Sequence, residues 1–237
     1  TIALPLAAAS HRLVPDNFSK SEITVRQQLS RTRNAVRRPG LTGALVVNLV
    51  FAAASFGVLL VALPLYLEAA FDARPALRGA FLALSSLGAV VAGLGTARIR
   101  VVLDVRWTLT TAAGVTAIST FVGGLTTTAI VVAVAVFAFG IASGLANPTI
   151  QDFIASAVGP DERAVGLSAF VSTMRLGQAL GPLVVGALVG PFSPSLAMLI
   201  VAGVLAGLAL ILSVGIVGDE TGRRSISVNE SNLAHRE

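Results

Sequence analysis

The chain has 237 residues, of which 54% are hydrophobic and only 12% are charged, and its mean hydropathy is +0.84. Soluble domains carry about 25% charged residues, so this composition excludes an ordinary soluble fold and predicts a membrane protein with several spans. The net charge of +5 comes from arginines gathered mostly between apolar stretches, which fits membrane topology better than nucleic-acid binding. Because the chain has no cysteine, disulfides and thiolate metal sites are excluded.

The segment 1–9 is apolar but too short to cross a bilayer. No basic residue precedes it, whereas the apolar core of a signal peptide follows a basic region. We expect this segment to be the end of a transmembrane helix that begins before the first residue of the sequence. A peripheral segment is the alternative.

Residues 10–40 are rich in arginine and are predicted to form a cytoplasmic linker with an amphipathic helix over 19–38. Ser19 and Glu22 have the spacing of a capping box. The stripe that follows is formed by Val25, Leu29, Thr32 and Val36. A basic amphipathic helix of this kind lies along the inner leaflet, with its arginines near anionic headgroups. The alternative is a solvated linker.

A membrane-spanning helix needs about 20 predominantly apolar residues, and six stretches of the chain qualify. They are 41–67, 76–97, 107–125, 128–154, 164–190 and 195–217. The connections between them are short, so consecutive helices are expected to be antiparallel. The sequence therefore predicts an all-α, polytopic bundle of six transmembrane helices over 41–218, followed by a polar tail, 219–237, that we expect to be disordered.

The basic residues fall mainly on one side of this predicted topology. That side collects Arg12, Lys20, Arg26, Arg31, Arg33, Arg37, Arg38, Arg98, Arg100, Arg106, Arg163, Arg223, Arg224 and Arg236. The opposite side has only Arg74 and Arg78. Because positively charged loops stay in the cytoplasm, we expect the segment before the first span and the C-terminal tail to be cytoplasmic.

The fifth predicted span carries a charge near its middle. A rotation of about 100° per residue places Ser168, Ser172 and Arg175 on one face and Gly177 and Gly181 on the opposite face. A guanidinium at membrane depth costs several kcal/mol unless it faces a polar cavity or a partner. The polar face is therefore a candidate substrate or coupling path. The alternative is a structural ion pair with a carboxylate outside this sequence.

Small residues and a proline in the fourth and fifth spans suggest close helix packing and a hinge. Glycines four residues apart let a neighbouring backbone approach closely, and an internal proline removes a backbone hydrogen bond and can kink a helix. The candidate packing and hinge positions are Gly140, Gly144, Gly177, Gly181, Pro182 and Gly186.

Three amide side chains also fall within predicted spans. Asn147 and Gln151 share a face of the fourth span, and Asn48 lies in the first. We include all three in the candidate substrate or coupling path. The alternative is that they form hydrogen bonds between helices.

The sequence contains no arrangement typical of an enzyme. His11 and His235 are isolated in a loop and in the tail, so neither a metal cluster nor a histidine base is indicated. A glycine-rich phosphate loop with its lysine does not occur. We therefore expect no catalytic residue, no metal ligand and no cofactor.

Several motifs resemble a known family. The stretch from Asn147 and Pro148 through 160–163 to Arg175, Gly181 and Pro182 is similar to the tenth helix, cytoplasmic loop and eleventh helix of the major facilitator superfamily. The segment 63–67, Leu-Pro-Leu-Tyr-Leu, is similar to the end of its seventh helix. The chain thus resembles the C-terminal half of such a transporter.

Two features of the family are only partly matched. The loop between helices eight and nine often reads Gly-x-x-x-Asp-Arg, and here Gly95 and Arg100 fit, whereas Ile99 replaces the acid. An antiporter-type motif, Gly-x-x-x-Gly-Pro-x-x-Gly-Gly, fits the fifth span except that Val185 replaces one glycine. In the family this motif belongs to helix five, which is related by the internal repeat to helix eleven.

The resemblance implies that the six spans are helices seven to twelve, built as two inverted three-helix repeats. It implies a secondary transporter of the cell membrane, embedded in the lipid bilayer, whose site lies against an N-terminal six-helix half. The expected activity is proton-coupled efflux of small drug-like molecules or metabolites. Uptake of a nutrient anion, anchored by Arg175, and a membrane module that does not transport are the alternatives.

Overall fold

A computed structural model describes residues 39–102, 104–159 and 162–214. These residues all lie within one compact unit, Thr32–Glu237. The expectations for the first helix end, for the amphipathic helix and for the C-terminal tail lie outside the described residues. Of the predicted linker, 10–40, only Pro39 and Gly40 are described, and both belong to the first helix.

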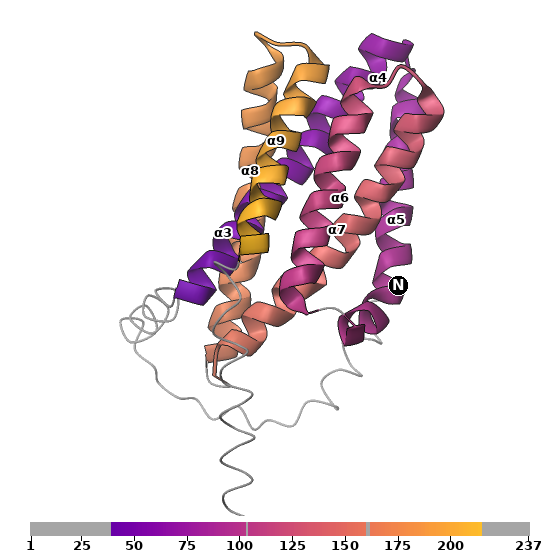
Figure 1. The fold of residues 1–237 in the computed structure, drawn as a ribbon. Coiled ribbons are helices and arrows are strands. Elements are labelled where there is room, and N and C mark those ends of the chain that lie inside the picture. Colours follow the sequence, from indigo (N-terminus) through magenta and orange to yellow (C-terminus); the bar gives the residue numbers. More distant parts are fainter. Residues whose placement is uncertain (1–38, 103, 160–161, 215–237) are drawn as a thin grey trace, which may run out of the picture. The chain divides into compact units, whose positions relative to one another are not determined.

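The described chain is helical, as the sequence predicts, and its helices form six successive rods (Figure 1). The first rod comprises α3 (Pro39–Gly57), the π-helical turn η1 (Val58–Ala62) and α4 (Leu63–Phe71). The other five are α5 (Pro75–Val102), α6 (Val105–Leu125), α7 (Ala129–Ala157), α8 (Arg163–Val189) and α9 (Pro194–Val214). Each rod contains one of the six predicted spans or most of it.

Five of the six rods are long and apolar enough to cross a membrane: α3 to α4, α5, α6, α7 and α9. The exception is α8, which has 27 residues and thus sufficient length. Its composition is less apolar because Arg175 and Gln178 lie within it. The helix that interrupts the apolar pattern is therefore the one with the candidate polar face.

Local sequence explains several boundaries of these rods. Asp72 ends α4 in the left-handed conformation, with φ of 49°, and its N–H donates to the carbonyl of Glu68. Pro75 and Pro194 begin α5 and α9, where proline fits because the first helical N–H has no partner within the helix. Within the first rod, the N–H of Leu63 donates to the carbonyl of Val58, which is a π-type bond.

The six rods associate in specific pairs. The most extensive contacts join α3 to α8, α5 to α7 and α6 to both α9 and α7. If the first three rods are exchanged with the last three, the α3–α8 pair becomes the α7–α5 pair and the α6–α9 pair maps onto itself. These three pairs follow the pattern expected for two inverted three-helix repeats, whereas the counterpart of the α6–α7 contact, between α9 and the first rod, is much smaller.

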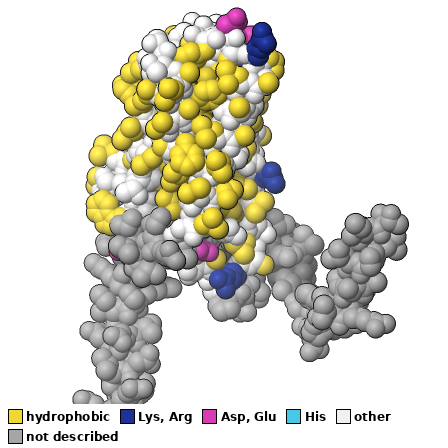
Figure 2. All heavy atoms as spheres, turned by 90° about the vertical axis from the view of Figure 1, so that its right-hand side faces the viewer, with side chains coloured by type: hydrophobic (Ala, Val, Ile, Leu, Met, Phe, Trp, Pro, Cys, Tyr) yellow, Lys and Arg dark blue, Asp and Glu magenta, His cyan; other side chains and the backbone are white. Residues whose placement is uncertain are grey.

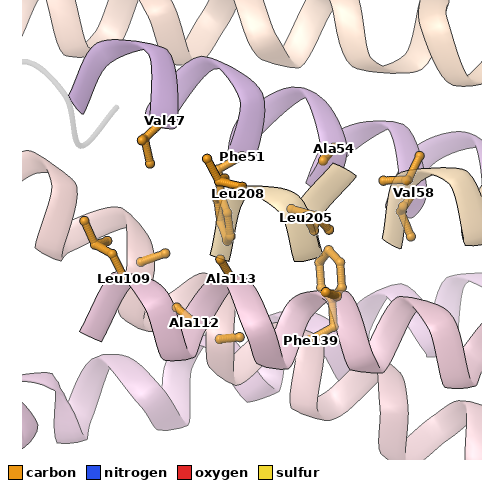
Figure 3. Packing of buried hydrophobic residues seen from close by; sticks show 14 of the residues in the cluster. Val47, Phe51, Ala54, Val58, Leu109, Ala112, Ala113, Phe139, Leu205 and Leu208 are labelled. Atoms are coloured by element: carbon orange, nitrogen blue, oxygen red, sulfur yellow. The ribbon is translucent and has the colours of Figure 1, made fainter. Parts of the chain in front are cut away.

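The apolar core lies where α3 and η1 meet α6, α7 and α9. Figure 3 shows Phe51 of α3 and Val58 of η1 beside Ala113 of α6, Phe139 of α7 and Leu205 of α9. Lipid tails are as apolar as these side chains, so close packing contributes more to helix association in a bilayer than removal from water does. The core thus holds α3 between α8 on one side and α7 and α9 on the other.

Large apolar side chains also cover the outside of the bundle. Ile118, Leu183 and Leu210 are 64%, 69% and 65% exposed, and hydrophobic side chains dominate the face seen in Figure 2. Charged side chains gather at the two ends of that face, apart from one basic side chain at its edge. An exposed apolar surface of this extent is typical of a protein embedded in lipid or covered by another part of a membrane protein.

Candidate functional site

The predicted polar face of α8 lies on the exposed side of that helix. Ser168, Ser172 and Arg175 are all exposed, and their spacing of four and three residues places them one above the other. The hydroxyl of Ser168 donates to the carbonyl of Ala164 at 2.8 Å, and that of Ser172 donates to the carbonyl of Ser168 at 2.8 Å. The two hydroxyl oxygens still have lone pairs to offer on this face.

Arg175 is the thirteenth of the 27 residues of α8, so its charge belongs to the middle of the helix. Its Nη1 donates to Oε1 of Gln178 at 3.1 Å. Among residues 39–102, 104–159 and 162–214, no carboxylate forms an ion pair with its guanidinium. The cation is therefore exposed and neutralised by no acid in the described part of the chain.

The opposite face of α8 packs tightly against α3. A Cβ added at Gly177 would lie 2.6 Å from the carbonyl oxygen of Leu49 and 2.8 Å from Cβ of Ala52. A Cβ added at Gly181 would overlap the carbonyl oxygen of Ala53. These distances are too short for a side chain, so glycine permits the approach of the two backbones.

A second pair of glycines has the same relation to α5. A Cβ at Gly144 of α7 would lie 2.5 Å from the carbonyl oxygen of Ala89, and one at Gly140 would overlap the carbonyl oxygen of Ser85. Gly88 on α5 approaches α7 in return, facing the carbonyl of Phe137. Both helix pairs are therefore in close backbone contact through glycines, although the glycine pair lies on α8 in one and on α7, the counterpart of α3, in the other.

Gly186 and Pro182 differ from the other candidate packing positions. Gly186 is exposed, and an added Cβ would meet no atom of the described chain within 4 Å. Within this part of the protein it packs against no helix, because it lies on the outer side of α8 with Arg175. Pro182 lies inside α8, which continues as one α-helix to Val189.

Asn48 is 1% exposed, in contrast to Ser168, Ser172 and Arg175 on the exposed face of α8. Its Nδ2 donates to the carbonyl of Phe170 at 2.9 Å and to Oγ1 of Thr173 at 2.8 Å, both on α8. Both bonds turn the amide toward α8, so in this conformation Asn48 forms hydrogen bonds between helices. A place for Asn48 in a substrate or coupling path stays a prediction.

Asn147 and Gln151 are exposed on α7. The Nδ2 of Asn147 donates to the carbonyl of Ser143 at 3.1 Å, along its own helix. These two residues precede the end of α7 by ten and six positions, whereas Ser168 and Ser172 follow the start of α8 by five and nine. Since the helices are consecutive and joined by a short connection, the amides lie at depths similar to those of the two serines.

Two polar contacts were not foreseen from the sequence. Arg106, at the start of α6, donates from Nε to the carbonyl of Leu212 at 3.0 Å and from Nη2 to that of Ser213, at the end of α9. The hydroxyl of Tyr66 in α4 donates to the carbonyl of Thr126, in the connection before α7. From the sequence, Arg106 was assigned only to the basic residues between spans. The neighbouring residues do not indicate which helix end its side chain contacts.

Six helical rods with five candidate membrane spans, paired as inverted repeats, define a multi-pass membrane protein. The family model of the Major Facilitator Superfamily matches residues 45–234, which is most of the chain. The chain therefore belongs to this superfamily, whose members are transmembrane transporters and not enzymes. No curated protein matches the chain.

Proposed function

We propose that this chain forms part of a proton-coupled exporter of small, partly hydrophobic drug-like molecules or metabolites in the cell membrane. The observation that carries the proposal is the exposed polar face of α8, with Ser168, Ser172 and Arg175 in the middle part of a helix. Facing lipid, the guanidinium would cost several kcal/mol. A water-filled or protein-lined path on that side removes this cost.

A transport path needs a second wall, and we propose that an N-terminal six-helix half supplies it. The support is the inverted-repeat pairing of the described helices, which in this superfamily belongs to each of two halves. The polar face of α8 then looks toward the midplane between the halves. Alternating access follows from rocking of one half against the other.

The residues of the path and of the helix pairs have different proposed roles. Asn147 and Gln151 line the path because they are exposed at depths similar to those of Ser168 and Ser172. Gly177 and Gly181, like Gly140 and Gly144, keep each helix pair together while the half moves. Pro182 is the proposed hinge within α8.

Arginine carries a permanent charge, so Arg175 is not the proton carrier of this mechanism. The described acidic residues lie at or near helix ends: Glu68, Asp72, Asp104, Asp152 and Glu162. We therefore place the titrating carboxylate in the N-terminal half. Its protonation would couple proton entry to substrate exit.

The orientation that we propose follows the basic residues. The end of the bundle where α3, α6 and α8 begin carries most of them and is cytoplasmic, together with the C-terminus. The other end, with Arg74 and Arg78, faces outward. The ion pair between Nη1 of Arg78 and Oε2 of Glu68, at 2.8 Å, belongs to this outer end.

Flux in proteoliposomes tests this function. The full-length protein is reconstituted, a pH gradient is imposed, and the movement of cationic, neutral and anionic compounds is followed for wild type and for Arg175→Gln. We expect flux that depends on the gradient and is abolished in the variant at equal folded yield. Flux unchanged by the substitution would remove Arg175 from the path.

Two alternatives give different results in the same experiment. The exposed cation at Arg175 also favours uptake of a nutrient anion, which would appear as proton-driven flux of anions in the same direction as the protons. A membrane module that does not transport would show no flux of any compound in the panel. Either result would contradict export.

A further inference from the structure

We propose that Arg175 and Gln178 form the anion-binding half of a substrate site, and that the substrates are organic anions with an apolar body. The physiological use of this site rests on the proposed transport function. The binding of anions at this site does not depend on transport, so the anion site and the transport function can be refuted independently.

The hydrogen bond between these residues leaves mainly donors on the exposed face. Oε1 of Gln178 accepts from Nη1 of Arg175 at 3.1 Å. A guanidinium has five N–H donors and no acceptor, and a carboxamide adds two more through its nitrogen. The oxygen of the carboxamide is therefore engaged, while most of the N–H groups are available. Such a pair matches carboxylate, sulfonate or phosphate oxygens and repels an ammonium group.

The contact between α3 and α8 fixes the direction of this pair. Thr173 accepts a hydrogen bond from Asn48 of α3, and Gly177 lies against the same helix. Arg175 is two residues from each, which corresponds to a rotation of about 200° around the helix in either direction. The guanidinium is thus held on the side of α8 that points away from α3, so a ligand does not have to reorient the helix.

Apolar side chains flank the donors on the exposed side of α8. Val171 and Leu176 are 45% and 50% exposed, and Ala179 is exposed one turn beyond Arg175. A ligand that places its charged group at Arg175 would lay its remaining atoms against these side chains. In surroundings of low polarity a charge-assisted hydrogen bond is stronger than in water, and this favours anions that also carry an aromatic or aliphatic body.

A carboxylate outside the described residues would occupy the same donors. In that case Arg175 is an internal ion pair, and added anions bind no better than neutral analogues. This outcome would oppose the proposal. Equilibrium binding distinguishes an internal ion pair from an anion-binding site.

The test compares three probes that share a naphthalene ring: a sulfonate, its neutral sulfonamide and a quaternary ammonium derivative. A sulfonate stays ionised, so it does not follow a pH gradient as a weak acid would. Binding to the full-length protein in detergent is measured by isothermal titration calorimetry, and uptake into proteoliposomes is measured separately. We expect wild type to bind the sulfonate at least tenfold more tightly than either analogue.

The variants identify the donors. Arg175→Gln should weaken sulfonate binding by about tenfold to a hundredfold, the range for hydrogen bonds to a charged group, with little change for the sulfonamide. Arg175→Lys, which keeps the charge but not the planar fork, should lie between. Gln178→Met should weaken binding less than Arg175→Gln. Arg163→Gln, an exposed arginine at the start of the same helix, is the matched control and should bind like wild type.

The outcomes distinguish the site from the transport function. Sulfonate binding that depends on Arg175, without flux of any compound, would leave the anion site standing and contradict the exporter. Flux of compounds regardless of their charge, with equal binding of the three probes, would overturn the anion site while supporting transport. If Arg175→Gln fails to fold, unchanged sulfonate affinity in both Arg175→Lys and Gln178→Met would still overturn the proposal.

Discussion

Asn48 shows how a single side chain can set the position of a neighbouring helix. Its amide is buried and donates to two acceptors on α8, the carbonyl of Phe170 and Oγ1 of Thr173. Thr173 lies two residues before Arg175, so this contact and the exposed guanidinium are on opposite sides of α8. We regard Asn48 as a residue that positions Arg175 without touching a substrate.

We predict that Asn48→Leu destabilises the protein. Hydrogen bonds between helices in membrane proteins contribute about 0.6 kcal/mol each on average, so the loss of two bonds should lower the free energy of unfolding by about 1 kcal/mol. Unfolding in mixed micelles measures this difference. Asn147→Leu is the control, because the amide of Asn147 is exposed and bonds only within its own helix. Equal stability of the two variants would contradict the prediction.

At the scale of helices, the glycines of α8 separate into two groups by their neighbours. Gly181 lies against the backbone of α3, whereas Gly186, five residues later, has no neighbour among the described residues. The same substitution in one helix therefore tests packing with a matched control. Helix propensity alone favours alanine over glycine at both positions.

We predict opposite effects of alanine at these two positions. Gly181→Ala forces α3 and α8 apart and should cost about 1–3 kcal/mol, the usual range for overpacking, whereas Gly186→Ala should be neutral or slightly stabilising. Thermal unfolding of the two purified variants measures the difference. Gly140→Ala should resemble Gly181→Ala, because it meets the backbone of α5 in the related pair. A neutral Gly181→Ala would show that the helices can separate without cost.

Arg106 connects the start of α6 to the end of α9. Its guanidinium bonds the carbonyls of Leu212 and Ser213, in the last described turn of α9. A cation at a helix C-terminus also interacts favourably with the helix dipole. The contact therefore stabilises the end of α9 in particular.

We predict that Arg106→Met increases fraying at the end of α9. The last turn loses its external donors, so its backbone amides should exchange hydrogen faster, while those at the centre of α9 are unchanged. Hydrogen–deuterium exchange with peptide resolution measures this. Arg74→Met, at an exposed arginine near the other end of the bundle, serves as the control. Uniform exchange along α9 in both variants would argue against a stabilising contact between Arg106 and the end of α9.

At the scale of the whole bundle, the pairing of rods indicates which helices move together. The α6–α9 pair maps onto itself under the exchange of repeats and contacts the other helices mainly through α7. Gly124 of α6 faces α9 so closely that an added Cβ would lie 3.0 Å from Cβ of Met198. The chain has no cysteine, so an engineered pair of cysteines can be studied without interference from native thiols.

We predict that Gly124→Cys with Met198→Cys forms a disulfide and leaves transport nearly intact. The Cβ separation is slightly below the usual range of about 3.5–4.5 Å, so a small shift of the helices suffices. If α6 and α9 move as one body, flux in the oxidised protein should stay within about twofold of the reduced form. The single-cysteine variants control for each substitution. A disulfide that stops flux would show that the two helices separate during the cycle.

Much of this architecture follows from local sequence. A span of about 20 apolar residues is the length that a bilayer requires, so the six rods and their approximate ends could be predicted without knowledge of their partners. The helical period alone also separated Arg175 from Gly177 and Gly181 on α8. The family motifs are local too, since they depend on residue types at fixed spacing within one helix and its adjoining loop.

Which helices pack against one another is determined by contacts between residues that are distant in the sequence. Asn48 bonds residues 122 and 125 positions away, and Arg106 bonds a residue of α9 that is 106 positions away. Gly186, a candidate packing position, has no neighbour within 4 Å among the described residues. A helical period states which side chains share a face, but it contains no information on what covers that face. Only the assembled bundle determines this, because the choice depends on how well all six surfaces pack at once.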